Sequence, residues 1–281
     1  MLDYAIAAAL MYTIPFVFAD AFSKRVIRKI GAYRTGVIVL AAGFLTVIAA
    51  STLVPIGTYS IYSIVLAIIS GIIVGAGYLL FYKSMETEQI SNAIALSEVG
   101  SIMFVAFGFI VLNESITAVG IIGALIVFIG AIFIATTEER NLNRKLLPAI
   151  ASYVLWSVAF IIFSYSIKAS TSFVMPLLVA KITMLAAFSI AGLLVSYKKA
   201  RKASFNDIKE AAAIGLLEGT GTIGFSLAVV LSAIGLAGII NALSPVIGGF
   251  VGYTMYKERF TKLQAYGFAA MIIGALIVVI S

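Results

Sequence analysis

The chain has 281 residues, of which 62% are hydrophobic and 11% are charged, and it carries a formal net charge of +7 with no cysteine and no histidine. Its apolar residues fall in long runs, which excludes an ordinary soluble domain. The lack of cysteine and histidine excludes disulfides, thiolate chemistry and most transition-metal sites, so the sequence predicts no metal and no cofactor.

Ten apolar windows are long enough to cross a bilayer, which requires about 20 mostly apolar residues. In chain order they lie at 2–22, 33–54, 61–82, 90–112, 117–136, 147–168, 173–196, 209–232, 236–256 and 262–280. The first window follows no charged segment and precedes nine others, so it indicates a true span and not a signal peptide. The expected fold class is an all-α membrane protein with ten transmembrane helices in a lipid bilayer.

The basic residues lie in the short connections between these windows, where they report topology and do not indicate binding of nucleic acid. Of the 19 Lys and Arg residues, all but Lys168 and Lys181 fall in the odd-numbered connections. By the positive-inside rule, we expect the odd-numbered connections in the cytoplasm and both termini outside the cytoplasmic membrane.

The two halves of the chain resemble each other. Residues 2–24 align without gaps on 146–168, and the alignment places Phe16 opposite Phe160. The segments ALSEV and ALSPV, NESIT and KERFT, and the IGA triplets of the fifth and tenth windows recur at nearly the same offset. Apolar helices share small residues by chance, but four collinear matches favour a repeat.

Each half holds five expected spans, an odd number, so the second half enters the membrane from the opposite side. The sequence therefore predicts two inverted five-helix repeats, residues 1–145 and 146–281, which together form one transmembrane domain. Inverted repeats of this kind are typical of secondary transporters, whose substrate sites lie between the halves near the bilayer midplane.

These repeated motifs resemble the drug/metabolite transporter superfamily, specifically its ten-helix EamA-like members. The resemblance covers the whole chain and implies a transporter that moves a small metabolite. Two features depart from the family pattern. Glu98 stands in the first half where relatives have proline, whereas the second half keeps Pro245. The basic residues also lie on the odd connections instead of the even ones, so the resemblance implies no direction of transport.

Three ionisable residues lie deep within expected spans, namely Glu98, Lys181 and Glu218. Each is about nine or ten residues from a window's start, hence about 12–15 Å deep and near the midplane of a roughly 30 Å core. We expect Lys181 to attract an anionic group and the glutamates to bind an amine or a proton. The alternative is that Lys181 only neutralises one glutamate in a structural ion pair.

Aromatic and small polar side chains on neighbouring windows are further candidates for binding substrate, although they could equally serve helix packing. These candidates are Tyr12, Tyr78, Tyr82, Ser97, Trp156, Phe225 and Asn241. Asp20 lies two residues before the expected end of the first helix and is expected to be interfacial. Glu258 is expected to cap the last helix near its N-terminus.

The sequence thus predicts a secondary transporter that moves an amino acid or similar metabolite by alternating access, with proton coupling through a carboxylate. The segment GAGYLLF (75–81) lacks the Lys-Ser/Thr of a nucleotide-phosphate loop, so no ATPase motif is present in it. Alternatives are a drug, sugar or nucleotide-derivative transporter of the same fold, or an intramembrane enzyme using Glu98 and Glu218. We expect no enzyme activity, a small-molecule substrate and a monomer or homodimer.

Overall fold

The computed structural model describes residues 2–86, 103, 107, 117–135, 147–196, 202–231 and 234–280. Within these ranges the regular structure is helical, and one isolated bridge joins Tyr59 to Ser170. Helices long and apolar enough to cross a membrane are Asp3–Ile30, Ala32–Ser51, Ile61–Met85, Leu147–Lys168, Val174–Leu194, Phe205–Val230 and the broken segment Ile234–Tyr256. Shorter apolar helices lie at Ala118–Gly130 and Lys262–Ile277. The chain is therefore an all-helical, multi-pass membrane protein.

Except at the end of the first, the described helices begin and end within a few residues of the expected windows. They are α1 (Leu2–Ile30), α2 (Ala32–Ser51), α3 (Ile61–Met85), α6 (Ala118–Ala135), α7 (Leu147–Lys168), α8 (Val174–Ser196), α9 (Phe205–Val230), α10 (Ile234–Asn241), α11 (Ser244–Tyr256) and α12 (Lys262–Ile280). The fourth window, 90–112, lies outside the described residues except for residues 103 and 107.

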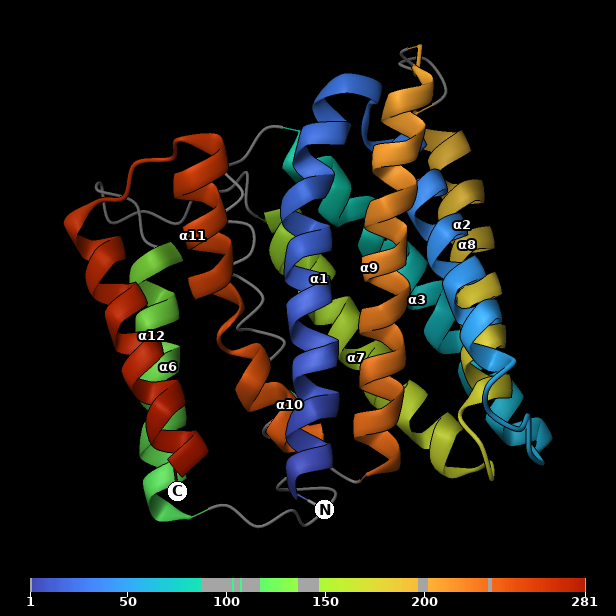
Figure 1. Cartoon of the computed structure of the whole chain (residues 1–281), viewed down its shortest axis with the longest axis horizontal. Coiled ribbons are helices and arrows are strands. Elements are labelled where there is room, and N and C mark those ends of the chain that lie inside the picture. The colour runs from blue at the N-terminus through green and yellow to red at the C-terminus, as the bar shows by residue number, and fades with distance from the viewer. Residues whose placement is uncertain are drawn as a thin grey trace.

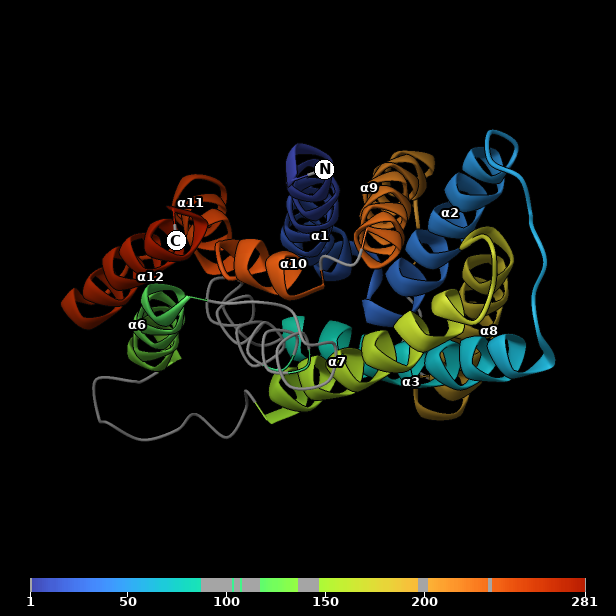
Figure 2. The same cartoon turned by 90° about the horizontal axis from the view of Figure 1, so that it is seen from below.

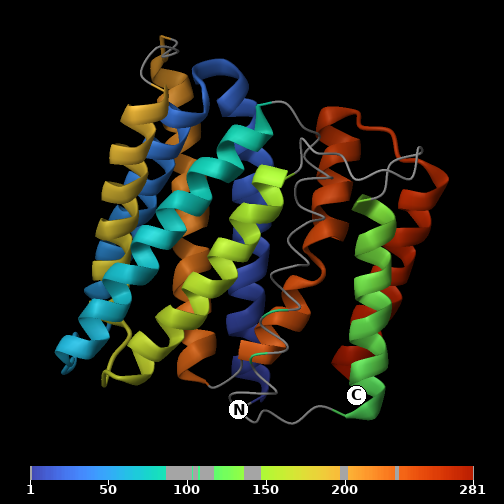
Figure 3. The ribbon, with the colours of Figure 1, turned by 180° about the vertical axis from the view of Figure 1, so that it is seen from behind.

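Helices α1 and α9 run side by side through the middle of the bundle (Figure 1). Helices α3 and α7 pack on each other and cross one face of the bundle obliquely (Figure 3). Helix α2 packs on α9 and α8 at one side of the bundle. Helices α6 and α12 form a pair at the opposite side, and the view from below separates this pair from the α3–α7 layer (Figure 2). The first helix begins and the last helix ends at the same end of the bundle (Figure 1).

The first helix is longer than expected. It continues beyond residue 22 to Ile30, and its 29 residues span about 44 Å, more than the roughly 30 Å hydrocarbon core. The predicted end was wrong because charged residues end the apolar run without ending the helix. Asp20 therefore lies well inside α1. The chain reverses into α2 at Gly31, whose φ of 87° is accessible to glycine at little cost.

Glu258 is the expected cap of α12. A reciprocal capping box starts that helix instead, in which Gln264 Oε1 accepts from the Thr261 amide at 3.0 Å and Thr261 Oγ1 accepts from the Gln264 amide at 3.2 Å. Glu258 Oε1 lies 3.5 Å from Lys24 Nζ of α1, and both side chains are buried. This contact joins segments from the two halves of the chain.

The ninth expected span is discontinuous. Helix α10 ends at Asn241 and α11 begins at Ser244, with a turn between them. Pro245 stands in the first turn of α11, where its missing amide costs least, and it cannot continue a preceding helix. The Ser244 hydroxyl donates to Asn241 Oδ1 at 3.1 Å, which links the two segments across the break.

The two ends of the bundle are held by different chemistry. At one end, uncharged groups join the α2–α3 connection to the α7–α8 connection, and the Thr171 amide donates to the Thr58 carbonyl at 3.0 Å. At the other end, ion pairs join α1 to α9: Arg25 to Glu210 at 3.1 Å and Lys29 to Glu210 at 2.7 Å. The second end also carries the capping box of α9, formed by Ser204 and Asp207.

Candidate functional site

A small cavity of about 30 Å³ lies between α1, α3, α7, α8 and α9. Both halves of the chain contribute to its wall. The lining residues are Phe16, Ser70, Gly71, Val74, Tyr78, Phe160, Phe163, Leu177, Ala180, Lys181, Met184, Glu218 and Thr222. The wall is thus mainly apolar and aromatic, with few polar groups, as is usual for small-molecule sites.

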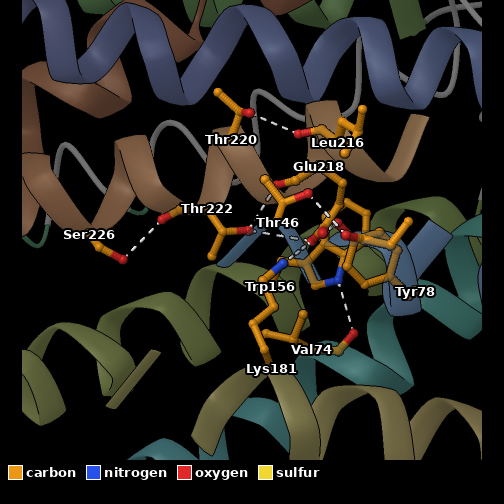
Figure 4. A network of polar contacts seen from close by, with 11 residues as sticks. Thr46, Val74, Tyr78, Trp156, Lys181, Leu216, Glu218, Thr220, Thr222 and Ser226 are labelled. Carbon is orange, nitrogen blue, oxygen red and sulfur yellow. Dashed lines mark hydrogen bonds and ion pairs between the residues drawn. The ribbon is translucent and has the colours of Figure 1, made fainter. Parts of the chain in front are cut away.

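Lys181 and Glu218 form an ion pair in this wall. Lys181 Nζ of α8 donates to Glu218 Oε1 of α9, and both side chains are only 2% exposed (Figure 4). The Tyr78 hydroxyl donates to the same oxygen at 3.2 Å, and the Thr222 hydroxyl lies 3.4 Å from it. The structure therefore brings together two of the three predicted ionisable residues and adds two hydroxyl groups to one carboxylate oxygen.

The second oxygen of Glu218 has a different environment. Oε2 is buried and accepts no hydrogen bond from any residue that the structure describes. It lies against Gly43 of α2, where an added Cβ would collide with it. A buried carboxylate oxygen without a donor is costly, so this atom is a natural position for a bound group that supplies a proton or a positive charge.

Tyr78 is held in place by neighbouring aromatic rings. Its ring centroid is 4.7 Å from that of Trp156, whose Nε1 donates to the Val74 carbonyl at 3.2 Å (Figure 4). Tyr82 packs edge-on against Tyr78 at 5.6 Å, and the Ser23 hydroxyl lies 3.5 Å from the Tyr82 hydroxyl. Of the predicted aromatic residues, Tyr78 lines the cavity, whereas Trp156 and Tyr82 lie behind it.

The other predicted candidates lie farther from the ion pair. Tyr12 and Phe225 are buried with ring centroids 5.3 Å apart, and they are absent from the cavity lining. Asn241 is buried at the break between α10 and α11 and does not line the cavity. Glu98 and Ser97 lie outside the described residues.

Several lining residues were absent from the sequence-based set. Phe16 and Phe160 occupy equivalent positions in the two aligned segments, and this equivalence is the signal that could have identified them. Thr222 follows Glu218 by four residues and therefore shares its helix face. Ser70 and Met184 gave no comparable signal, because only the packing of α3 on α8 turns them towards the cavity.

The arrangement presents one cation and one anion side by side on an apolar wall. Such a wall suits a small ligand that carries an ionic group as well as apolar surface. The described residues contain no group of three or more His, Cys, Asp or Glu side chains that could hold a metal ion.

The sequence and the fold of this chain resemble those of known proteins. A solved structure titled "Crystal structure of protein" has the same fold, with a TM-score of 0.73 and 13% sequence identity over 98% of this chain and 96% of that one. No curated protein matches the sequence. The model of the EamA-like transporter family matches residues 3–136 and again 144–280, once in each half. The chain therefore belongs to the EamA-like transporter family and is a membrane transporter of the drug/metabolite transporter type.

Proposed function

We propose that this protein is a secondary transporter that moves an amino acid or similar zwitterion across the cytoplasmic membrane by alternating access. The observation that carries the proposal is the buried Lys181–Glu218 pair in the wall of a cavity to which both halves contribute. In this proposal, ten transmembrane helices form two inverted repeats, residues 1–145 and 146–281, that move against each other around the cavity. The protein has no enzyme activity.

The ion pair explains how a zwitterion would be recognised. The substrate carboxylate binds Lys181 and its ammonium group binds Glu218, so two intermolecular ion pairs replace one intramolecular pair. Separating a buried ion pair without such replacement is costly, which disfavours movement of charges through an empty site. The substrate side chain then contacts Phe16 and Phe160, which face the same cavity.

The repeat organisation is supported by the family match in each half and by the equivalent positions of Phe16 and Phe160. The proposed orientation places the end with Arg25 and Lys29 in the cytoplasm, in accord with the positive-inside rule, and both termini outside. The cavity lies within one chain, so a monomer suffices for transport and a homodimer would carry two independent sites.

Binding and uptake by two variants test this proposal. Trp156 is the only tryptophan and packs on Tyr78, so its fluorescence reports ligand binding next to Glu218. The compounds tested for binding and uptake are alanine, leucine, phenylalanine, glutamate and lysine, together with a sugar, a nucleotide and a lipophilic drug cation. We expect saturable binding of neutral amino acids and their uptake into proteoliposomes. Lys181→Met and Glu218→Gln should each abolish uptake.

The matched controls carry the same substitutions outside the cavity. Lys168→Met removes an exposed lysine, and Glu210→Gln removes a carboxylate of α9 whose ion pairs are partly exposed and therefore weak. Both should transport as the wild type does. Uptake of the sugar, nucleotide or drug in place of amino acids would refute the assigned substrate class. Unchanged uptake by both cavity variants would refute the assigned site.

A further inference from the structure

Aromatic rings next to the cavity form two clusters, one towards each end of the bundle. The first comprises Tyr12, Phe160 and Phe225, and the second comprises Tyr78, Phe81 and Trp156. Tyr12 of α1 and Trp156 of α7 occupy equivalent positions in the two halves. Because α7 runs opposite to α1 (Figures 1 and 3), the cluster of Tyr12 lies towards the termini and that of Trp156 towards the basic end of α1. We call them the terminal cluster and the basic cluster.

In the terminal cluster, Phe160 fastens α7 to the neighbouring helices α1 and α9. Its ring centroid lies 4.7 Å from that of Phe225 in α9 and 6.3 Å from that of Tyr12 in α1. Tyr12 and Phe225 also contact each other, with centroids 5.3 Å apart. Aromatic rings attract one another at these separations. The terminal cluster therefore holds three helices together between the cavity and the end that carries the termini.

The basic cluster lacks the corresponding ring. Phe16 of α1 is the equivalent of Phe160, but its ring centroid lies 5.5 Å from that of Tyr12 and 6.5 Å from that of Phe160 itself. In the part of the chain that the structure describes, Phe16 makes no ring contact with Trp156 or Phe81. The rings of the basic cluster all belong to α3 and α7. The two ends of the cavity thus differ in whether an aromatic ring fastens α1 and α7 together.

Phe16 and Phe160 lie between the two clusters and line the cavity. Both are partly buried, and each packs against the apolar residues around the terminal cluster as well as those around the basic cluster. The cavity of about 30 Å³ has room for water but not for an amino acid. A substrate therefore enters only when side chains of the lining move apart, and these two rings are placed to do so.

We propose that Phe160 and Phe16 control access to the cavity from opposite sides of the membrane. In this structure Phe160 closes the terminal side. In the opposite state Phe160 leaves Phe225, and Phe16 packs on Trp156 and closes the basic side. The exchange follows from the inverted repeat, because equivalent residues of the two halves make the same contact in alternate states. The proposal rests on the alternating access of the proposed function and assigns one side chain to each side.

Thiol labelling from each side of the membrane tests these roles without any substrate. The chain has no cysteine, so Ser70→Cys places a single thiol in the cavity wall. Right-side-out and inside-out membrane vesicles expose one side at a time to a small, impermeant methanethiosulfonate reagent. Asp3→Cys, prepared as a separate protein, identifies the side of the termini, because Asp3 is exposed in the first turn of α1. The labelling rate of Ser70→Cys reports how much of the protein is open to that side.

Substitution of the two rings in this protein should change the labelling in opposite directions. Phe160→Leu keeps an apolar side chain but loses the aromatic contacts of the terminal cluster, so labelling from the terminal side should rise about threefold to tenfold. Phe16→Leu weakens the state in which the basic side is closed. Labelling from the terminal side should therefore fall by a similar factor, and labelling from the basic side should rise. Phe250→Leu, at an exposed position of α11, is the control and should leave both rates unchanged.

Two results would overturn the proposal: faster labelling of both variants from both sides, which shows that the rings only fill space, and unchanged rates in both. If Phe160→Leu fails to fold, Phe225→Leu removes the partner ring of the same contact and must raise labelling from the terminal side. If the opposite shifts are found but no amino acid is taken up, the proposed substrate fails and the roles of the two rings stand. If amino acids are taken up while neither variant shifts the labelling, the roles of the rings fail and the proposed function stands.

Discussion

Lys181→Met should destabilise the protein by about 3–5 kcal/mol, because it leaves the Glu218 carboxylate buried without its cation. The double variant Lys181→Met with Glu218→Gln should recover most of this loss, since a neutral amide can still accept from Tyr78. The measurement is the free energy of unfolding in mixed micelles titrated with a denaturing detergent. A double-variant cycle then gives the coupling between the two side chains directly.

Uptake measurements distinguish a structural role of the Lys181–Glu218 pair from a role in binding substrate. The stable double variant should remain unable to take up amino acids, because both groups that recognise the zwitterion are missing. Lys168→Met combined with Glu210→Gln is the control and should keep both stability and uptake. If the double variant regains transport together with stability, the ion pair is only structural, which was the alternative that the sequence left open.

Gly224→Val should have the second largest effect on stability, about 3 kcal/mol, at the upper end of the range for overpacking. An added Cβ at Gly224 would collide with backbone atoms of Met11 and Tyr12 in α1. Backbone atoms cannot move aside as a side chain does, so α1 and α9 must separate. The separation also displaces Phe16 and Glu218 across the cavity, and we expect uptake to be lost with stability.

The same mixed-micelle titration measures this loss. Ala213→Val adds a similar volume to α9 at an exposed position and is the control, which should change the free energy of unfolding by less than about 0.5 kcal/mol. If Gly224→Val is as stable as Ala213→Val, the close approach of α1 and α9 is not required.

Much of the fold followed from local properties of the sequence. The length of each apolar run predicts a span, because the backbone in a bilayer must satisfy its own hydrogen bonds within a helix. The broken helix α10–α11 follows from Pro245, which cannot continue a helix. The end of α1 was misjudged because Lys24 to Lys29 mark the end of apolar surface and not the end of helical hydrogen bonding.

The depth of Lys181 and Glu218 was likewise predictable, since depth depends only on the position of a residue within its span. Their partners were not, because a partner depends on which helix faces meet. Tyr78 lies 140 positions before Glu218 in the chain, and only the packing of the helices brings its hydroxyl to Glu218 Oε1.

The sequence by itself thus determined that this is a membrane protein of apolar helices, that its halves resemble each other, and that Lys181 and Glu218 are too deep to remain without compensation. Only the tertiary structure decided which oxygen of Glu218 binds Lys181, which oxygen lacks a donor, and that Phe16 and Phe160 face the same cavity. The physical reason is that hydrophobicity and helix formation are local properties, whereas contacts between charges depend on helix rotation and register.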